Sequence, residues 1–347
     1  MHPRDRTLSG HPDIAIMEAT MHDSAAPRPR LIREVDEAVA LLRAGEVVAL
    51  PTETVYGLAA LADAPDAVAR IYSLKGRPAT NPLILHVADT AMLAGWTPPL
   101  GDRALKLAEA FWPGPLTMVL PALSRVSRRI TAGQDTVAVR LPAHPLMRAV
   151  IAGVGQPLVA PSANLSTRLS PTTAAHVAGQ FRDRDMVILD GGPCTVGLES
   201  TIVSVLPGRP VALLRPGTLG AAALSRVLDE PVAQGEAMDA GVRVPGQMKL
   251  HYAPRQPLVL VRQALAADLD DPSCGWVTPG IALRAAGPVL DLGSEPGPFA
   301  RELYAALHDL EDRDVAVIRV VLPPEGPAWR AVHDRLGRAS AGRDLPA

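Results

Sequence analysis

Lysine is scarce in this chain, since only three of its 34 basic residues are lysines: Lys75, Lys106 and Lys249. Lysine carries a compact point charge on a flexible stem, whereas arginine is a planar fork. The two therefore do not replace each other at a tight phosphate or carboxylate site. A lysine kept in a sequence that otherwise uses arginine is a candidate for chemistry. Lys75 and Lys249 are the stronger candidates, because both lie in stretches typical of loops.

Aromatic residues, cysteine and net charge are also low. Aromatics make up 3% of the chain, so the core must be built from Val, Leu, Ile and Ala. Cys194 and Cys274 are far apart and form no metal-binding spacing, and with no signal peptide the expected compartment is a reducing cytoplasm. A net charge of -2 argues against tight nonspecific binding of nucleic acid. No apolar run approaches the ~20 residues that span a bilayer, so no membrane association is expected.

The order of helical and extended patterns predicts two α/β domains, which is also what a chain of 347 residues suggests. Residues 1–28 have little periodicity and are expected to form a flexible tail. Helical and apolar extended runs alternate over 29–228, which predicts a domain wrapped around a large twisted sheet. Residues 229–256 are rich in Pro and Gly and are typical of a linker. Residues 257–347 form a smaller second α/β unit.

Polar groups follow the predicted strands of the first domain. Residues 51–57 (PTETVYG) come directly after the first buried strand, where open sheets bind ligands. A second cluster contains Lys75 and Arg77, with Asn81 and His86 nearby. Two cations one residue apart repel each other, so a shared polyanion such as a nucleotide triphosphate explains them better than folding alone.

Small hydroxyl and amide groups follow later strands in the same way. Residues 160–164 (APSAN) come after an apolar strand, and 197–201 (GLEST) add a flexible glycine and two hydroxyls. Such groups are suited to hydrogen bonding with phosphate oxygens. None of these segments matches a Walker loop or a dinucleotide fingerprint, and no catalytic triad or metal set is visible. The residues favour recognition of anions and hydroxyls over a protein nucleophile.

In this order, the segments resemble the threonylcarbamoyl-AMP synthase family in its long form, a YrdC-like domain followed by a linker and a C-terminal domain. The matching stretches are PTETVYGL (51–58), KGRPATNPLILHV (75–87), WPGPLT (112–117), TVAVRLPAHP (136–145), APSANLS (160–166), GLESTIV (197–203), LLRPG (213–217) and PGQMKLHYAP (245–254). The resemblance implies a twisted, open, mixed sheet with a large concave cavity, followed by a smaller Rossmann-like domain.

The activity implied by the resemblance is synthesis of threonylcarbamoyl-adenylate from L-threonine, bicarbonate and ATP, with release of pyrophosphate. The product would supply the downstream machinery that modifies tRNA adenosine next to the anticodon. Such a reaction needs no protein nucleophile, because the site only has to gather, desolvate and align its substrates. Mg²⁺ would accompany ATP and be held by the phosphates, with no metal ligands from the protein. A monomer is expected.

The same resemblance assigns roles to individual residues. Those matching the signature tetrad of the family are Lys75, Arg77, Ser162 and Asn164. Those expected at ATP are Arg77, Asn81, Thr136, Ser162, Ser170, Arg215 and Tyr252, the last folding back from the linker. Those expected at threonine are Thr52, His86, Arg140, Ala160 (through its backbone) and Ser200.

Alternative functions stay open at this point. An RNA-binding module is one, because the cavity of this fold is basic and the pathway ends on tRNA, so a weak RNA contact is conceivable. The low net charge and few aromatics argue against it. A carbamoyl-transfer paralogue is another, but such proteins carry acylphosphatase and zinc-finger modules that this sequence lacks. A paralogue without synthase activity would not be expected to keep the tetrad and the HYAP segment.

Overall fold

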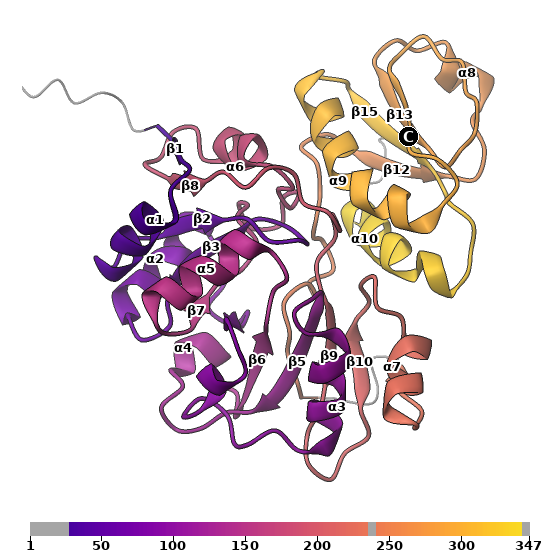
Figure 1. The fold of residues 1–347 in the computed structure, drawn as a ribbon. Coiled ribbons are helices and arrows are strands. Elements are labelled where there is room, and N and C mark those ends of the chain that lie inside the picture. The colour runs from indigo at the N-terminus through magenta and orange to yellow at the C-terminus, as the bar shows by residue number, and fades with distance from the viewer. Residues whose placement is uncertain (1–27, 235–240, 342–347) are drawn as a thin grey trace, which may run out of the picture.

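The computed structural model describes residues 28–234 and 241–341. Within these residues, the larger sheet has eleven strands in the order β1-β8-β2-β3-β7-β4-β6-β5-β9-β10-β11 (Figure 1). They are β1 (Arg30–Ile32), β2 (Val48–Leu50), β3 (Gly57–Leu61), β4 (Ile84–His86), β5 (Leu116–Pro121), β6 (Thr136–Arg140), β7 (Leu158–Val159), β8 (Val187–Leu189), β9 (Thr201–Ser204), β10 (Ala212–Arg215) and β11 (Ala233–Gln234). Some neighbouring strands are parallel and others are antiparallel, so the expected mixed sheet is confirmed.

Helices cover both faces of this sheet, which explains why its strands read as nearly continuous apolar runs. The helices are α1 (Val35–Arg43), α2 (Pro65–Lys75), α3 (Asp102–Phe111), α4 (Arg128–Thr131), α5 (Pro145–Val154), α6 (Ala174–Gln180) and α7 (Ala221–Leu228), with a 3₁₀ turn at Ala91–Leu93. Successive side chains of β2 point to opposite faces. Val48 and Leu50 pack with α1 and α5, whereas Ala49 belongs to the core that contains α2 and α3.

The second unit is built on a four-stranded parallel sheet within the described residues, in the order β12-β15-β13-β14. Its elements are β12 (Leu258–Val261), α8 (Ala266–Leu269), β13 (Cys274–Thr278), β14 (Val289–Asp291), α9 (Pro296–Asp312), β15 (Val317–Val321), a 3₁₀ turn at Pro327–Trp329 and α10 (Arg330–Ser340). The periodicity did not predict β13, because Gly275 interrupts its apolar run. A Cβ at Gly275 would lie 2.9 Å from Leu310 of α9, so glycine lets this helix pack close to the sheet.

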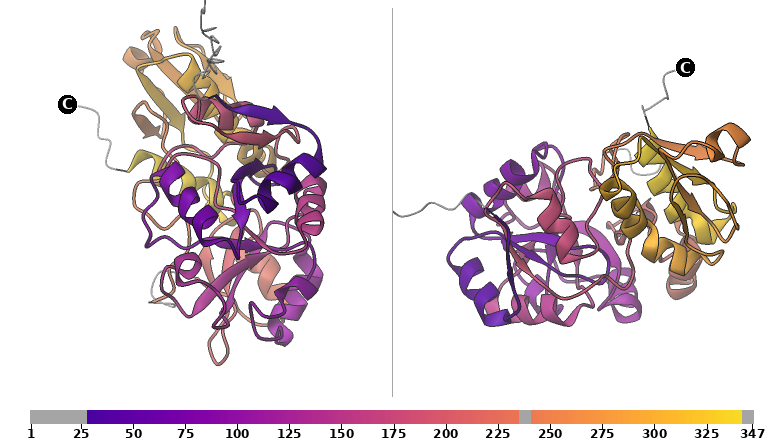
Figure 2. Two further views of the ribbon diagram at one scale, coloured as in Figure 1. Left: turned by 90° about the vertical axis from the view of Figure 1, so that its left-hand side faces the viewer. Right: turned by 90° about the horizontal axis from the view of Figure 1, so that it is seen from above.

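The two units lie side by side (Figures 1 and 2), and residues of both share one hydrophobic core. Val55, Leu169 and Leu198 of the first unit belong to the hydrophobic core of the second. Gly197 makes the closest approach, since a Cβ there would lie 2.2 Å from the carbonyl oxygen of Arg301 in α9. This packing makes the contact between the units part of the folded structure.

The linker predicted over 229–256 begins inside the first unit, because β11 pairs with β10 and extends the large sheet. The tail predicted over 1–28 lies outside the described residues except for its last residue. In the described part of the chain, no helix combines the length and the apolar character needed to cross a membrane.

Candidate active site

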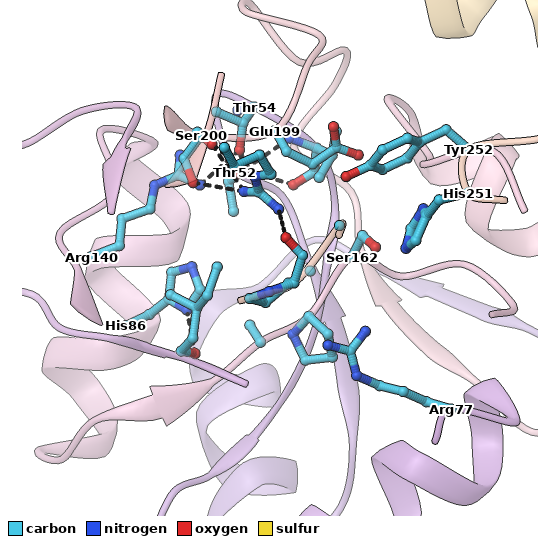
Figure 3. A pocket seen from close by; sticks show the side chains of 18 residues that line it. Thr52, Thr54, Arg77, His86, Arg140, Ser162, Glu199, Ser200, His251 and Tyr252 are labelled. Carbon is cyan, nitrogen blue, oxygen red and sulfur yellow. Dashed lines mark hydrogen bonds between the residues drawn. The ribbon is translucent and has the colours of Figure 1, made fainter. Parts of the chain in front are cut away.

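A pocket lies where the ends of several strands of the large sheet meet the linker (Figure 3). Its described lining residues are Thr52, Thr54, Val55, Gly57, Arg77, Ile84, His86, Arg140, Ala160, Pro161, Ser162, Glu199, Ser200, Arg215, Pro245, Gly246, His251 and Tyr252. We call Thr52, Thr54, His86, Arg140 and Ser200 the strand-end half, and Arg77, Ser162, Arg215, His251 and Tyr252 the linker half. The cavity volume is about 40 Å³, far below the roughly 300–1,000 Å³ of typical ligand pockets.

A threonine-based turn shapes the strand-end half immediately after β2. The Thr52 hydroxyl donates to the carbonyl oxygen of Val55 at 2.6 Å and accepts from the backbone N–H groups of Thr54 and Val55 at 3.1 and 3.2 Å. This turn aims the Thr54 hydroxyl at Arg140, whose Nη1 donates to it at 2.8 Å. Local turn chemistry therefore positions the cation at the end of β6.

Arg140 is buried and held from three sides. Besides Thr54, it contacts the carboxylate of Glu53 at 2.7 Å and the carbonyl oxygen of Gly114 at 3.2 Å. Burial would raise the pKa of the Glu53 carboxyl, but the Arg140 guanidinium outweighs burial and lowers it. Glu53 therefore stays ionised and fixes the guanidinium at the pocket wall.

His86 and Ser200 complete the strand-end half with neutral groups. Burial, followed by the nearby Arg140 charge, lowers the pKa of His86 to about 3, so the imidazole is neutral near pH 7. Its Nδ1 lies 3.1 Å from the carbonyl oxygen of Ile84. The Ser200 and Thr117 hydroxyls are 2.7 Å apart. This half therefore offers one fixed cation beside uncharged hydrogen-bonding groups.

Two arginines dominate the linker half. Arg77 donates to the carbonyl oxygen of Pro82 at 2.7 Å, and burial lowers its pKa to about 10, so it stays charged near pH 7. Arg215 donates to the carbonyl oxygen of Ser200 at 3.0 Å and, through Nη1, to that of Pro245 in the linker at 3.2 Å. Arg215 thus joins the sheet to the linker segment that covers the pocket.

The aromatic pair His251 and Tyr252 forms the linker wall of the pocket (Figure 3). The two ring centroids are 4.0 Å apart. Burial lowers the pKa of His251 to about 3. Tyr252 has a φ of 60°, in the left-handed region that non-glycine residues adopt only when their surroundings hold them there. The wall is therefore positioned by packing.

Lys75 is placed behind the pocket and does not belong to its lining. Its side chain is buried, and the ammonium donates to the backbone carbonyl oxygens of Ser162 and Asn164. Burial, followed by the Arg77 charge, lowers its pKa well below the ordinary value. In this structure Lys75 holds the 162–164 loop in place, and its role at the reacting groups stays a prediction.

Most of the predicted site residues come together in the pocket. All five residues expected at threonine line it, as do Arg77, Ser162, Arg215 and Tyr252. Besides Lys75, four predicted residues do not: Asn81, Thr136, Asn164 and Ser170. Their roles at a ligand stay predictions.

Each of these residues has an identifiable structural position. Thr136 begins β6 and Arg140 ends it, so at ~3.3 Å per residue they are ~13 Å apart along the strand. The Asn81 amide faces Met248 of the linker. Asn164 donates to the carbonyl oxygen of Leu165 at 2.7 Å, and Ser170 donates to Glu199.

Sequence reasoning assigned no role to several lining residues, notably Thr54, Glu199 and Gly246. All of them lie in segments that carried the family resemblance. A signal for Glu199 was therefore present: it is a carboxylate within an otherwise apolar and hydroxyl-bearing segment. Nothing local identified its main partner, which is 136 residues away in α10.

The chain is similar to known proteins along most of its length. A family model described as "Telomere recombination" matches residues 40–217, and one described as "Threonylcarbamoyl-AMP synthase, C-terminal domain" matches 219–341. A threonylcarbamoyl-AMP synthase from Bacillus subtilis is 39% identical over 325 residues, which are 89% of this chain and 94% of that protein. One from Halorhodospira halophila is 43% identical over 181 residues, 52% of this chain and 93% of that protein.

The fold has a close counterpart among solved structures. The crystal structure of Pyrococcus abyssi Sua5 complexed with L-threonine superposes with a TM-score of 0.81 at 36% sequence identity, and the match covers 90% of this chain and 97% of that one. Sequence, fold and the residues gathered in the pocket agree, and the chain belongs to the threonylcarbamoyl-AMP synthase family.

Proposed function

We propose that this chain makes threonylcarbamoyl-AMP from L-threonine, bicarbonate and ATP and releases pyrophosphate. The observation that carries the proposal is the pocket lining, in which Arg77, Arg140 and Arg215 converge with neutral hydroxyl and imidazole groups. Among the described lining residues, no hydroxyl is hydrogen-bonded to a histidine or a carboxylate. The site is therefore suited to holding anions together and has no activated protein nucleophile.

The residues divide the work of the reaction between the two halves. Arg140 and the neutral His86 would hold the carboxylate of threonine and the threonine groups next to it. Arg77 and Arg215 would offset the charge of the phosphates. The threonine amine takes up bicarbonate as a carbamate and water leaves. A carbamate oxygen then bonds to the α-phosphorus as the bond to pyrophosphate breaks. Because AMP is the group transferred, the reaction is a nucleotidyl transfer.

Magnesium is expected to accompany ATP. Among the described residues, no group of three or more His, Cys, Asp or Glu side chains is placed to hold a metal. The carboxylate of Glu199 at the pocket is paired with Arg335. Phosphate oxygens and water would supply most of the ligands, which suits Mg²⁺. The bound ion would reduce phosphate charge during the transfer.

The linker is proposed to act as a lid. A space of about 40 Å³ does not admit a nucleotide, and the segment from Pro245 to Tyr252 forms one wall of it. On this proposal the segment moves away from the sheet to admit ATP. Closing it again over ATP would exclude water and protect a carbamoyl-adenylate that hydrolyses readily.

Pyrophosphate release tests the proposed function when threonine and bicarbonate are omitted in turn. Release should require both, together with ATP. Release that continues without threonine would contradict the proposal, and turnover with carbamoyl phosphate would favour the carbamoyl-transfer alternative. Stabilisation of the fold by RNA, and not by ATP with threonine, would favour the RNA-binding alternative. The product would serve an enzyme that transfers the threonylcarbamoyl group to tRNA.

A further inference from the structure

A buried polar cluster joins the wall of the pocket to the second unit. Glu199 lines the pocket, and its Oε2 accepts from Nε of Arg335 in α10 at 2.8 Å and from the Tyr304 hydroxyl of α9 at 3.1 Å. The Ser170 hydroxyl donates to its other oxygen. Arg335 and Tyr304 are each only 1% exposed. The second unit therefore supplies two of the groups that hold the Glu199 carboxylate.

Arg335 also contacts the linker wall. The centre of its guanidinium lies 5.0 Å from the centroid of the Tyr252 ring, a cation–π arrangement. The Tyr252 hydroxyl and Arg335 Nη2 are both buried without a hydrogen-bond partner among the described residues. Buried polar groups are normally paired, and the Tyr252 hydroxyl points into the pocket (Figure 3). A ligand oxygen there would give it a partner.

Charge explains why the position of Arg335 matters. Glu199 is the single carboxylate among the described lining residues, and an unpaired carboxylate would repel a triphosphate. Burial would raise the pKa of Glu199, but Arg335, followed by Arg215, lowers it to about 2, so it is ionised near pH 7. Without Arg335, the Glu199 carboxylate would pair with Arg215. Arg215 would then be less available to bind the phosphates.

We propose that Arg335 is a positioning residue of the active site: it fixes Glu199 and the Tyr252 ring at the pocket wall and keeps Arg215 available to the nucleotide. The second unit is then part of the linker half and more than an anchor for the lid. This inference rests on the proposed function. It predicts a defect that is specific to ATP, because Arg335 contacts no residue of the strand-end half.

Steady-state kinetics with the full-length protein test this prediction. In Arg335→Met, the KM for ATP should rise at least about tenfold, while the KM for threonine stays within about threefold. Arg335→Lys should show a smaller rise, because lysine keeps the charge but lacks the planar fork. The double variant Glu199→Gln/Arg335→Met should recover most of the ATP KM, because the unpaired carboxylate is gone. Thermal melting of each variant reports folding.

Arg319→Met is the matched control. It removes another arginine of the second unit, one that is mostly buried and paired with Asp268 at 2.6 Å but does not line the pocket. Its KM for both substrates should equal that of the wild type. If Arg335→Met leaves the ATP KM unchanged, or raises both KM values together with no recovery in the double variant, Arg335 has only a structural role.

The role of Arg335 can be tested even if Arg335→Met does not fold or if the wild type releases no pyrophosphate. If Arg335→Met does not fold, Arg335→Lys and the double variant decide the question by the same two KM values. If the wild type releases no pyrophosphate, the proposed function fails. The dissociation constant of a non-hydrolysable ATP analogue, measured by calorimetry on the same variants, then tests Arg335 alone. A loss of at least about tenfold in Arg335→Met supports its role, and equal affinities overturn it.

Discussion

The two halves of the pocket differ in how much of the chain each needs. The strand-end half is built inside one unit, from groups at strand ends that are fixed by a local turn and by the Glu53–Arg140 pair. The linker half exists only where the sheet, the linker and α10 meet, through Arg215, Tyr252 and Arg335. Folding of the large sheet fixes the first half, whereas the second also depends on the position of a covering segment.

This difference gives each half a distinct vulnerability. Disturbing the strand-end half should change folding and chemistry together, because its cation is also half of a buried ion pair. Disturbing the linker half should mainly change nucleotide binding, since its parts can separate while the sheet stays intact. Substitutions that separate these effects test the comparison.

The largest effect is expected from Arg140→Met. Removing one member of a buried pair leaves Glu53 uncompensated, which costs about 3–5 kcal/mol of unfolding free energy. Activity should fall at least about a hundredfold, because a fixed cation is lost. The double variant Glu53→Gln/Arg140→Met should regain most of the stability, measured by urea unfolding, but none of the pyrophosphate release. Recovery of both would show that Arg140 is only structural.

The next largest effect is expected from Lys75→Arg, which tests the argument from lysine scarcity. The ammonium donates to the carbonyl oxygens of Ser162 and Asn164 in a buried space, where the larger, planar guanidinium would displace the 162–164 loop. Activity should fall by about ten- to a hundredfold, and Lys75→Ala should fall at least as far. Lys106→Arg, at an exposed position of α3, is the control and should match the wild type. Wild-type turnover in Lys75→Arg would remove the argument.

Sequence reasoning located the strand-end half well because its groups are adjacent in sequence to strands that the apolar pattern reveals. Thr52 follows β2, His86 ends β4 and Arg140 ends β6. A residue's position relative to a strand end is a local property, so a single sequence contains it. The same reasoning predicted a large twisted sheet, and the family resemblance implied that it is mixed. The short strands β1, β3, β11, β13 and β14 were missed.

The linker half shows what local patterns leave out. The contact between Glu199 and Arg335 spans 136 residues, and nothing near either residue indicates the other. Lys75 donates to the carbonyl oxygens of Ser162 and Asn164, and its role at a ligand stays a prediction. Composition identified an unusual lysine, but only packing could show which groups it contacts.

A smaller effect, confined to the linker half, is expected from Gly246→Ala. A Cβ there would lie 2.3 Å from the Tyr252 hydroxyl, and Gly246 has a φ of 88°, which strains any other residue. The KM for ATP should rise about tenfold with little change for threonine. Gly246→Ala/Tyr252→Phe should recover part of the loss, because the clashing oxygen is gone. Gly45→Ala is the control, since its φ is 82° and nothing lies within 4 Å of the added Cβ. If Gly246→Ala and Gly45→Ala have the same KM for ATP, neither backbone strain at Gly246 nor displacement of the Tyr252 ring affects nucleotide binding.

The smallest expected effect is on stability in acid, and it comes from the contact between the units. The pKa of Glu199 is lowered from 4.5 to about 2 in the folded protein. The stability this provides is complete above pH 4.5 and is lost as the pH falls towards 2, because the unfolded state then binds the extra proton. Glu199→Gln/Arg335→Met lacks this carboxylate, so its urea midpoint should fall less than that of the wild type between pH 5 and 3. The buried histidines His86 and His176, with pKa values lowered to about 3, weaken both proteins below pH 6.5 and cancel in the comparison. His251 does not cancel fully, because the Glu199 charge raises its pKa in the wild type alone, and this opposes the expected difference. Parallel acid profiles would show that Glu199 titrates alike in the folded and unfolded chains, and the buried pair would then contribute no pH-dependent stability to the junction of the two units.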